Sequence, residues 1–90
     1  MQLESRPVPT AGVLVQEMNG TRLLLDPETG NYFTLDEIGS RVWTLCDGRK
    51  AVAIADELSA EYDAPSSQIR DDVLELLREL ASERLIRESG

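Results

Sequence analysis

The stretch GNYFTLDEIGSRVW, residues 30–43, decides the fold because it passes from a strand pattern into a helix pattern without a loop. Residues 31–35 include aromatic and β-branched side chains, which are typical of strands. Thr34 and Glu37 then have the spacing of a capping box, which predicts Thr34 as the N-cap residue of a helix. Three of the chain's four aromatic residues lie here. The stretch is therefore either an aromatic core strand or the edge of a binding surface.

The residues before this stretch predict a three-stranded antiparallel meander. The pair Asn19-Gly20 favours a type I′ hairpin turn, and a two-residue loop places Glu17 directly opposite Arg22. The sequence DPETG then predicts a second hairpin loop. The last strand of the meander keeps one free edge. The predicted strands are residues 13–18, 21–25 and 31–35.

Three helices are predicted after the sheet. In the first, Ile38, Val42 and Leu45 recur at helical spacing, and Asp47-Gly48 marks its end. The second covers residues 51–62 and the third extends from Ser66 or Ser67 to about residue 83. On the third helix, one apolar arc comprises Ile69, Val73, Leu76, Leu77 and Leu80, and a separate strip of mixed apolar and basic character comprises Arg70, Leu74, Arg78, Ala81 and Leu85. Residues 83–86, ERLI, are expected to turn back against the core.

These elements indicate an α+β fold of the winged helix-turn-helix type, with a three-stranded antiparallel sheet followed by three helices. Residues 1–11 contain two prolines and no periodic pattern, so they are expected to form a flexible N-terminal tail. Residues 12–90 are expected to form a single small domain.

Composition argues against most kinds of chemistry. Nine basic and seventeen acidic side chains give a net charge of −8, which is unfavourable for binding nucleic acid or anionic membranes. There is no histidine, and the single cysteine, Cys46, has the helical phase of a core residue. No catalytic residue, metal site or cofactor is predicted. No secretory signal is visible, so a cytoplasmic location is expected.

A peptide-binding surface fits the pattern better. A free strand edge offers backbone N–H and C=O groups to which an extended peptide can add as another strand. Strand 31–35 beside the Arg70, Leu74 and Arg78 strip would form such a groove.

The chain also resembles a known family, the PqqD-like recognition elements for precursors of ribosomally synthesised and post-translationally modified peptides (RiPPs). The resemblance rests on LDEIG entering the first helix, DG ending it, EYDAP between the last two helices, and the order of strands and helices from Gly12 to about Ile86. It implies a non-catalytic, stand-alone domain that binds the leader segment of a precursor peptide and presents it to a modifying enzyme or leader peptidase. The pattern from Leu25 to Tyr32 favours a lasso-peptide type, and a pyrroloquinoline quinone (PQQ) type is the other possibility. The binding residues implied are Asn31, Tyr32, Phe33, Thr34, Leu35, Arg70, Val73, Leu74, Leu77 and Arg78.

Two other classes of function remain open at this point. A DNA-binding winged helix is the first, although the acidic third helix is unfavourable for contact with phosphates. A dimerisation module in which two free strand edges pair is the second.

Overall fold

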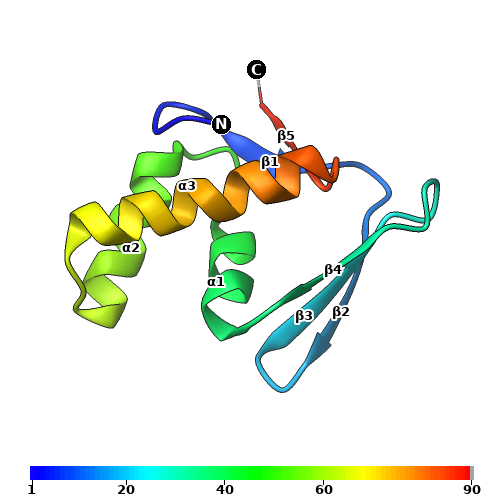
Figure 1. Cartoon of the computed structure of the whole chain (residues 1–90), viewed down its shortest axis with the longest axis horizontal. Coiled ribbons are helices and arrows are strands. Elements are labelled where there is room, and N and C mark those ends of the chain that lie inside the picture. The colour runs from blue at the N-terminus through cyan, green and yellow to red at the C-terminus, as the bar shows by residue number, and fades with distance from the viewer. Residues whose placement is uncertain (90) are drawn as a thin grey trace.

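The computed structural model describes residues 1–89 and has the α+β fold that the sequence predicts. A three-stranded antiparallel sheet precedes three helices, and two further short strands form a second sheet. In Figure 1, α3 runs across the upper half of the molecule below the two termini, α1 stands beneath it, and the three-stranded sheet extends away from α1. The elements are β1 (Pro7–Pro9), β2 (Leu14–Met18), β3 (Thr21–Leu25), β4 (Tyr32–Leu35), α1 (Glu37–Leu45), α2 (Ala51–Tyr62), α3 (Ser66–Ser82) and β5 (Ile86–Glu88).

The β2–β3 hairpin has the predicted register. Asn19 and Gly20 both have positive φ angles, 51° and 85°, as a type I′ turn requires. Glu17 lies opposite Arg22, and their side chains form an ion pair at 3.5 Å. Strand β4 pairs with β3, so the sheet has the order β2-β3-β4 and β4 lies at its edge.

The N-cap of α1 differs from the prediction. Asp36, not Thr34, is the N-cap residue, and its Oδ1 accepts a hydrogen bond from the Gly39 N–H at 2.7 Å. Thr34 lies inside β4, opposite Leu23. It cannot cap the helix because α1 begins only at Glu37, three residues further along the chain. One residue, Asp36, therefore separates β4 from α1.

The prediction that Ile38 belongs to the buried stripe of α1 is wrong. Val42 and Leu45 are buried as expected, whereas Ile38 is 49% exposed. The helix begins at Glu37, so Ile38 falls in its first turn, beyond the core.

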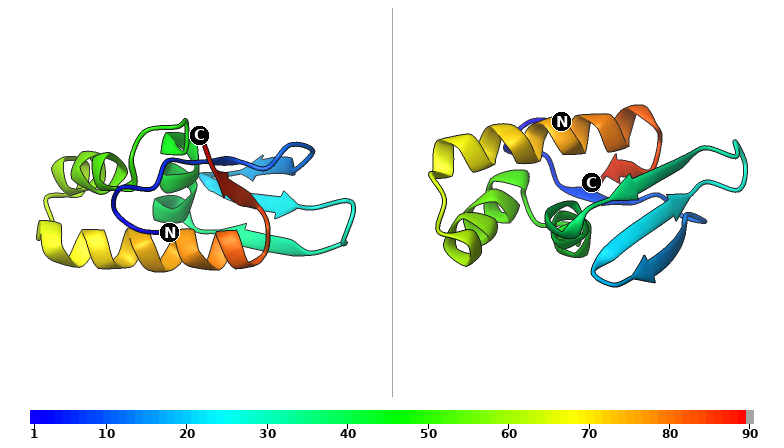
Figure 2. Two further views of the ribbon diagram at one scale, coloured as in Figure 1. Left: turned by 90° about the horizontal axis from the view of Figure 1, so that it is seen from above. Right: turned by 60° about the horizontal axis from the view of Figure 1, so that its bottom comes forward.

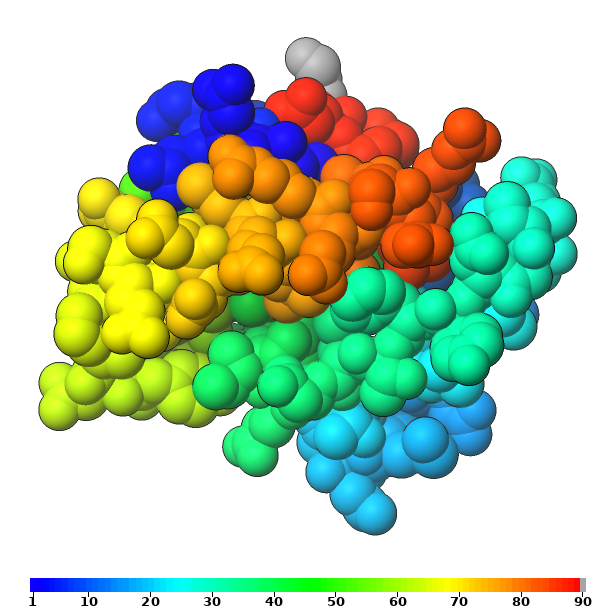
Figure 3. Space-filling model, in the orientation of Figure 1, coloured from blue at the N-terminus to red at the C-terminus, as the bar shows by residue number. Residues whose placement is uncertain are grey.

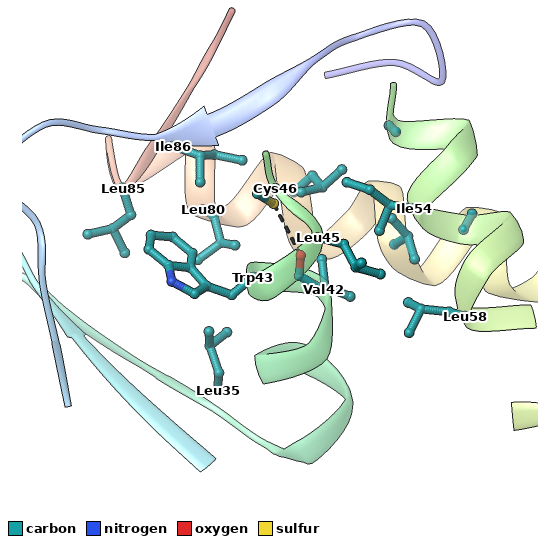
Figure 4. Packing of buried hydrophobic residues seen from close by; sticks show 14 of the residues in the cluster. Leu35, Val42, Trp43, Leu45, Cys46, Ile54, Leu58, Leu80, Leu85 and Ile86 are labelled. Atoms are coloured by element: carbon teal, nitrogen blue, oxygen red, sulfur yellow. Dashed lines mark hydrogen bonds between the residues drawn. The ribbon is translucent and has the colours of Figure 1, made fainter. Parts of the chain in front are cut away.

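One core holds the helices and the sheet together. It lies where α1 meets α2 and α3, and Leu24 and Leu35 extend it to the sheet. Figure 4 shows Trp43 lying among Leu35, Leu80 and Leu85, with its side chain only 9% exposed. Trp43 therefore connects α1 both to β4 and to the C-terminal end of α3.

The sequence predicts a flexible tail for residues 1–11, but the structure pairs this segment with the C-terminal strand and with the start of α2. Strand β1 pairs antiparallel with β5, with Pro7 opposite Glu88, and Figure 2 shows the two strands side by side. The Ser5 carbonyl accepts a hydrogen bond from the Ala51 N–H at 2.7 Å. The segment thus satisfies a backbone donor at the start of α2, which has no side-chain cap.

The C-terminal turn agrees with the sequence. Leu85 is fully buried and Ile86 is 3% exposed, so residues 83–86 do turn back against the core.

Candidate functional site

The outer edge of β4 has free backbone hydrogen-bonding groups. The Asp26 N–H donates to the Asn31 carbonyl at 2.9 Å. Hydrogen-bonded pairs alternate along an antiparallel ladder, so the pair formed by Leu24 and Phe33 exchanges the next bonds. The backbone groups of Tyr32 and Thr34 therefore point away from β3. Within residues 1–89, no strand pairs with β4 on that side.

This edge forms one wall of a groove, and α3 forms the other. The backbone of α3 packs mainly against α2 and β5. Figure 3 looks onto this face, with α3 in yellow to orange above β4 and the start of α1 in green. The groove is lined by Thr21, Phe33, Thr34, Leu35, Asp36, Ile38, Gly39, Asp72, Leu76 and Glu79.

The groove has an apolar floor. Phe33 and Leu76 are partly buried against the core, and the exposed Ile38 lies on the same side as Phe33. The alternation of β4 accounts for this arrangement: Phe33 and Leu35 face the core, and Tyr32, which is 69% exposed, faces the other way. The aromatic stretch thus supplies a core-facing side chain and an open strand edge together.

Gly39 keeps the corner between β4 and α1 tight. A Cβ atom added at this position would lie 3.2 Å from Asp36 Oδ1 and 3.2 Å from Leu35 Cδ2. Both contacts are closer than side-chain atoms normally allow. The glycine therefore lets the Asp36 carboxylate reach the helix N-terminus, which explains the LDEIG pattern physically.

None of the five residues predicted on the third helix lines the groove, and Leu74 is partly buried elsewhere on α3. Val73 and Leu77 are buried in the core. The Arg70 guanidinium pairs with Asp56 of α2 at 3.2 Å, and the Arg78 Nε donates to the Met1 carbonyl at 2.9 Å. Within the groove lining, α3 is represented only by Asp72, Leu76 and Glu79.

Helix geometry explains the difference. Successive residues are turned by about 100° around the helix axis. Asp72 and Leu76 therefore flank the buried Val73 and Leu77 on one side, and Leu74 lies on the opposite side. The sequence shows both flanks but not which one faces the sheet. The position of Leu76 at one edge of the predicted apolar arc is the sequence signal that could have identified this flank.

Of the residues predicted on strand 31–35, the structure brings Phe33, Thr34 and Leu35 into the groove. Tyr32 contributes its outward-pointing backbone, and Asn31 lies just before β4. The residues that the sequence analysis missed are Thr21, Asp36, Ile38, Gly39, Asp72, Leu76 and Glu79.

A reactive thiol, a cluster of metal ligands and a membrane-spanning helix are all absent from residues 1–89. The Cys46 thiol donates to the Val42 carbonyl at 3.3 Å, and burial raises its pKa to about 12, so it stays protonated and unreactive at neutral pH. Across residues 1–89, no three His, Cys, Asp or Glu side chains are grouped so that they could hold a metal ion. Each helix in that range is too short or too polar to cross a lipid bilayer.

Comparison with known sequences identifies related proteins. A family model described as coenzyme PQQ synthesis protein D (PqqD) matches residues 10–86. The chain is 41% identical to the PqqA binding protein of Xanthomonas axonopodis pv. citri (strain 306), over 93% of this chain and 92% of that protein.

Two solved structures share the fold. TbiB1, solved in complex with the TbiA(β) leader peptide, has a TM-score of 0.83 and 31% identity and covers 92% of this chain and 98% of its own. The PqqD part of Methylobacterium extorquens PqqCD, described as a functional and stand-alone RiPP recognition element, has a TM-score of 0.74 and 33% identity, covering 90% and 87%. These matches confirm both the predicted fold class and the family resemblance.

Proposed function

Because this chain belongs to the PqqD family, we propose that it binds the leader segment of a ribosomally synthesised precursor peptide. The observation that carries the proposal is the open edge of β4, which faces α3 across a groove. Its relatives support a binding role, since one is named for binding PqqA and another was solved with a leader peptide.

The proposed binding mode is strand addition. The leader extends the sheet by pairing with the outward backbone groups of Tyr32 and Thr34, and alternate side chains of the leader turn toward α3. The backbone bonds supply affinity without reading sequence. Specificity then comes from the groove side chains, chiefly Ile38 and Leu76.

The domain acts without chemistry of its own in this proposal. It holds the leader and presents the rest of the precursor to a separate modifying enzyme or leader peptidase. The pattern from Leu25 to Tyr32 favours a lasso-type leader, and the name of the Xanthomonas relative supports a PQQ-type precursor. Both peptides therefore belong in the test.

The test is a titration of the chain with fluorescently labelled leaders from precursor genes that neighbour its own, together with a PqqA peptide. We expect saturable binding of one peptide per chain, with amide chemical shifts changing at Tyr32 and Thr34. Tighter binding of one leader identifies the peptide class. No binding by any of these peptides would overturn the function, and binding that leaves the β4 amides unshifted would overturn strand addition.

A dimer formed through the same edge is the competing use of β4. Light scattering across a concentration series separates the two, because a β4-paired dimer would dissociate as the leader binds.

A further inference from the structure

The groove is acidic as well as apolar. Asp72 and Glu79 flank Leu76 on the α3 wall, and Asp36 stands on the opposite wall. The groove lining contains no basic side chain within the described part of the chain. Three carboxylates thus surround an apolar floor.

These carboxylates lack cationic partners in the folded chain. The ion pairs found among residues 1–89 join other side chains, and none includes Asp36, Asp72 or Glu79. The two basic residues of α3 cannot help, because Arg70 pairs with Asp56 and Arg78 is bound to the Met1 carbonyl on the other flank of the helix. A peptide that enters the groove therefore meets two α3 carboxylates that have no cationic partner among residues 1–89, while Asp36 is held at the N-terminus of α1 by the Gly39 N–H.

The dimensions of a strand and a helix indicate where a cation would lie. Same-face residues of a strand are about 6.7 Å apart. Along α3, Leu76 lies about 6 Å from Asp72 and about 4.5 Å from Glu79 in axial rise. When one peptide side chain packs against Leu76, the peptide residues two positions before and two positions after it therefore lie beside the carboxylates of Asp72 and Glu79.

From this we propose, building on the leader-binding function, that the groove selects a cationic peptide segment. The segment carries one aliphatic or aromatic side chain that packs between Ile38 and Leu76, and a Lys or Arg two positions away on one or both sides that pairs with Asp72 or Glu79.

The test is selection of a phage-displayed library of random linear peptides on the immobilised full chain at physiological ionic strength, where screening lengths are about 8 Å. We expect enrichment of an apolar residue with Lys or Arg at the second position on either side. The double variant Asp72→Lys/Glu79→Lys should enrich Asp or Glu at the same positions. Both side chains are exposed, so the fold should tolerate the change.

A matched control separates the groove from net charge. The double variant Asp71→Lys/Glu75→Lys makes the same charge change on the same helix, outside the groove lining, and should keep the basic preference. For the best peptide, replacing its Lys or Arg by Glu should raise Kd by at least about fivefold for each carboxylate contacted. The neutral variant Asp72→Asn/Glu79→Gln should remove most of that difference.

The outcomes distinguish this inference from the function on which it rests. Enriched peptides without a basic preference, or a preference that both double variants change equally, would overturn the charge selection while leaving leader binding intact. If no enriched peptide loses affinity when the β4 edge is blocked by Thr34→Pro, strand addition fails, whereas only the absence of binding by every leader in the titration above would overturn the proposed function itself.

Discussion

The outward N–H of Thr34 is the group whose removal tests strand addition most directly. Thr34 lies in an edge strand, and its N–H points away from β3, so proline at this position removes no bond of the sheet ladder. It does remove one donor for an added strand. Leaving a peptide carbonyl without its hydrogen-bond donor reduces the free energy of binding by about 1–3 kcal/mol. The expected rise in Kd is therefore roughly 5- to 150-fold.

The opposite edge of the same sheet offers a matched control. Val15 of β2 lies opposite Leu24, whose hydrogen bonds go to β4, so the Val15 N–H also points outward, but on the far side of the sheet. Val15→Pro makes the same change to an edge strand away from the groove. It should leave leader affinity unchanged and shift thermal unfolding by about as much as Thr34→Pro does.

Affinity is measured by isothermal titration of each variant with the leader that binds the unmodified chain. Thr34→Val retains the N–H while altering the side chain, so the difference between Pro and Val at this position isolates the backbone donor. If Thr34→Pro binds the leader as tightly as Val15→Pro does, the peptide does not pair with β4, and the proposed binding mode is wrong.

Three further predictions follow from the same contacts. Leu76→Ala should weaken leader binding more than Leu74→Ala in parallel titrations, because only Leu76 lines the groove; the reverse order would favour the opposite flank of α3. Asp36→Ala should lower the free energy of unfolding by about 1 kcal/mol in urea, since it removes the α1 cap, whereas Asp36→Asn should retain most of that stability. Burial raises the pKa of the Cys46 thiol from 9.0 to about 12, so between these values only the unfolded state loses the thiol proton. Stability should therefore fall there by about 1.4 kcal/mol per pH unit, and a Cys46→Ala chain with the same slope would contradict this.

The parts of the fold that the sequence predicts well are those fixed by local geometry. Asn19-Gly20 sets the hairpin register because few other residue pairs accept two positive φ angles in succession. The deciding interaction there lies within a few residues along the chain. Leu85 is different: its helical phase places it on the mixed strip of the third helix, but α3 ends at Ser82 and Leu85 is fully buried beside Trp43.

The predictions are wrong where the local structure depends on contacts with segments far away in the sequence. Thr34 and Asp36 both suit an N-cap, and the choice depends on how far the pairing of β4 with β3 extends. The pairing of Pro7 with Glu88 joins opposite ends of the chain and leaves no local pattern that could reveal it. Likewise, the flank of α3 that faces β4 depends on packing, which the helical periodicity of α3 alone does not contain.

The same long-range packing places both walls of the groove on one core. Asp36 alone joins β4 to α1, and its bond to Gly39 fixes the corner between them. Trp43 of α1 packs among Leu35 and Leu80, so the strand wall and the helix wall rest on one shared core. A groove whose walls cannot shift independently needs little ordering when a ligand enters, and ordering is a main cost of binding. Most of the entropy lost on binding is then that of the leader. Shortening the leader to the segment that spans the groove should therefore change affinity less than replacing the apolar leader side chain that packs against Leu76.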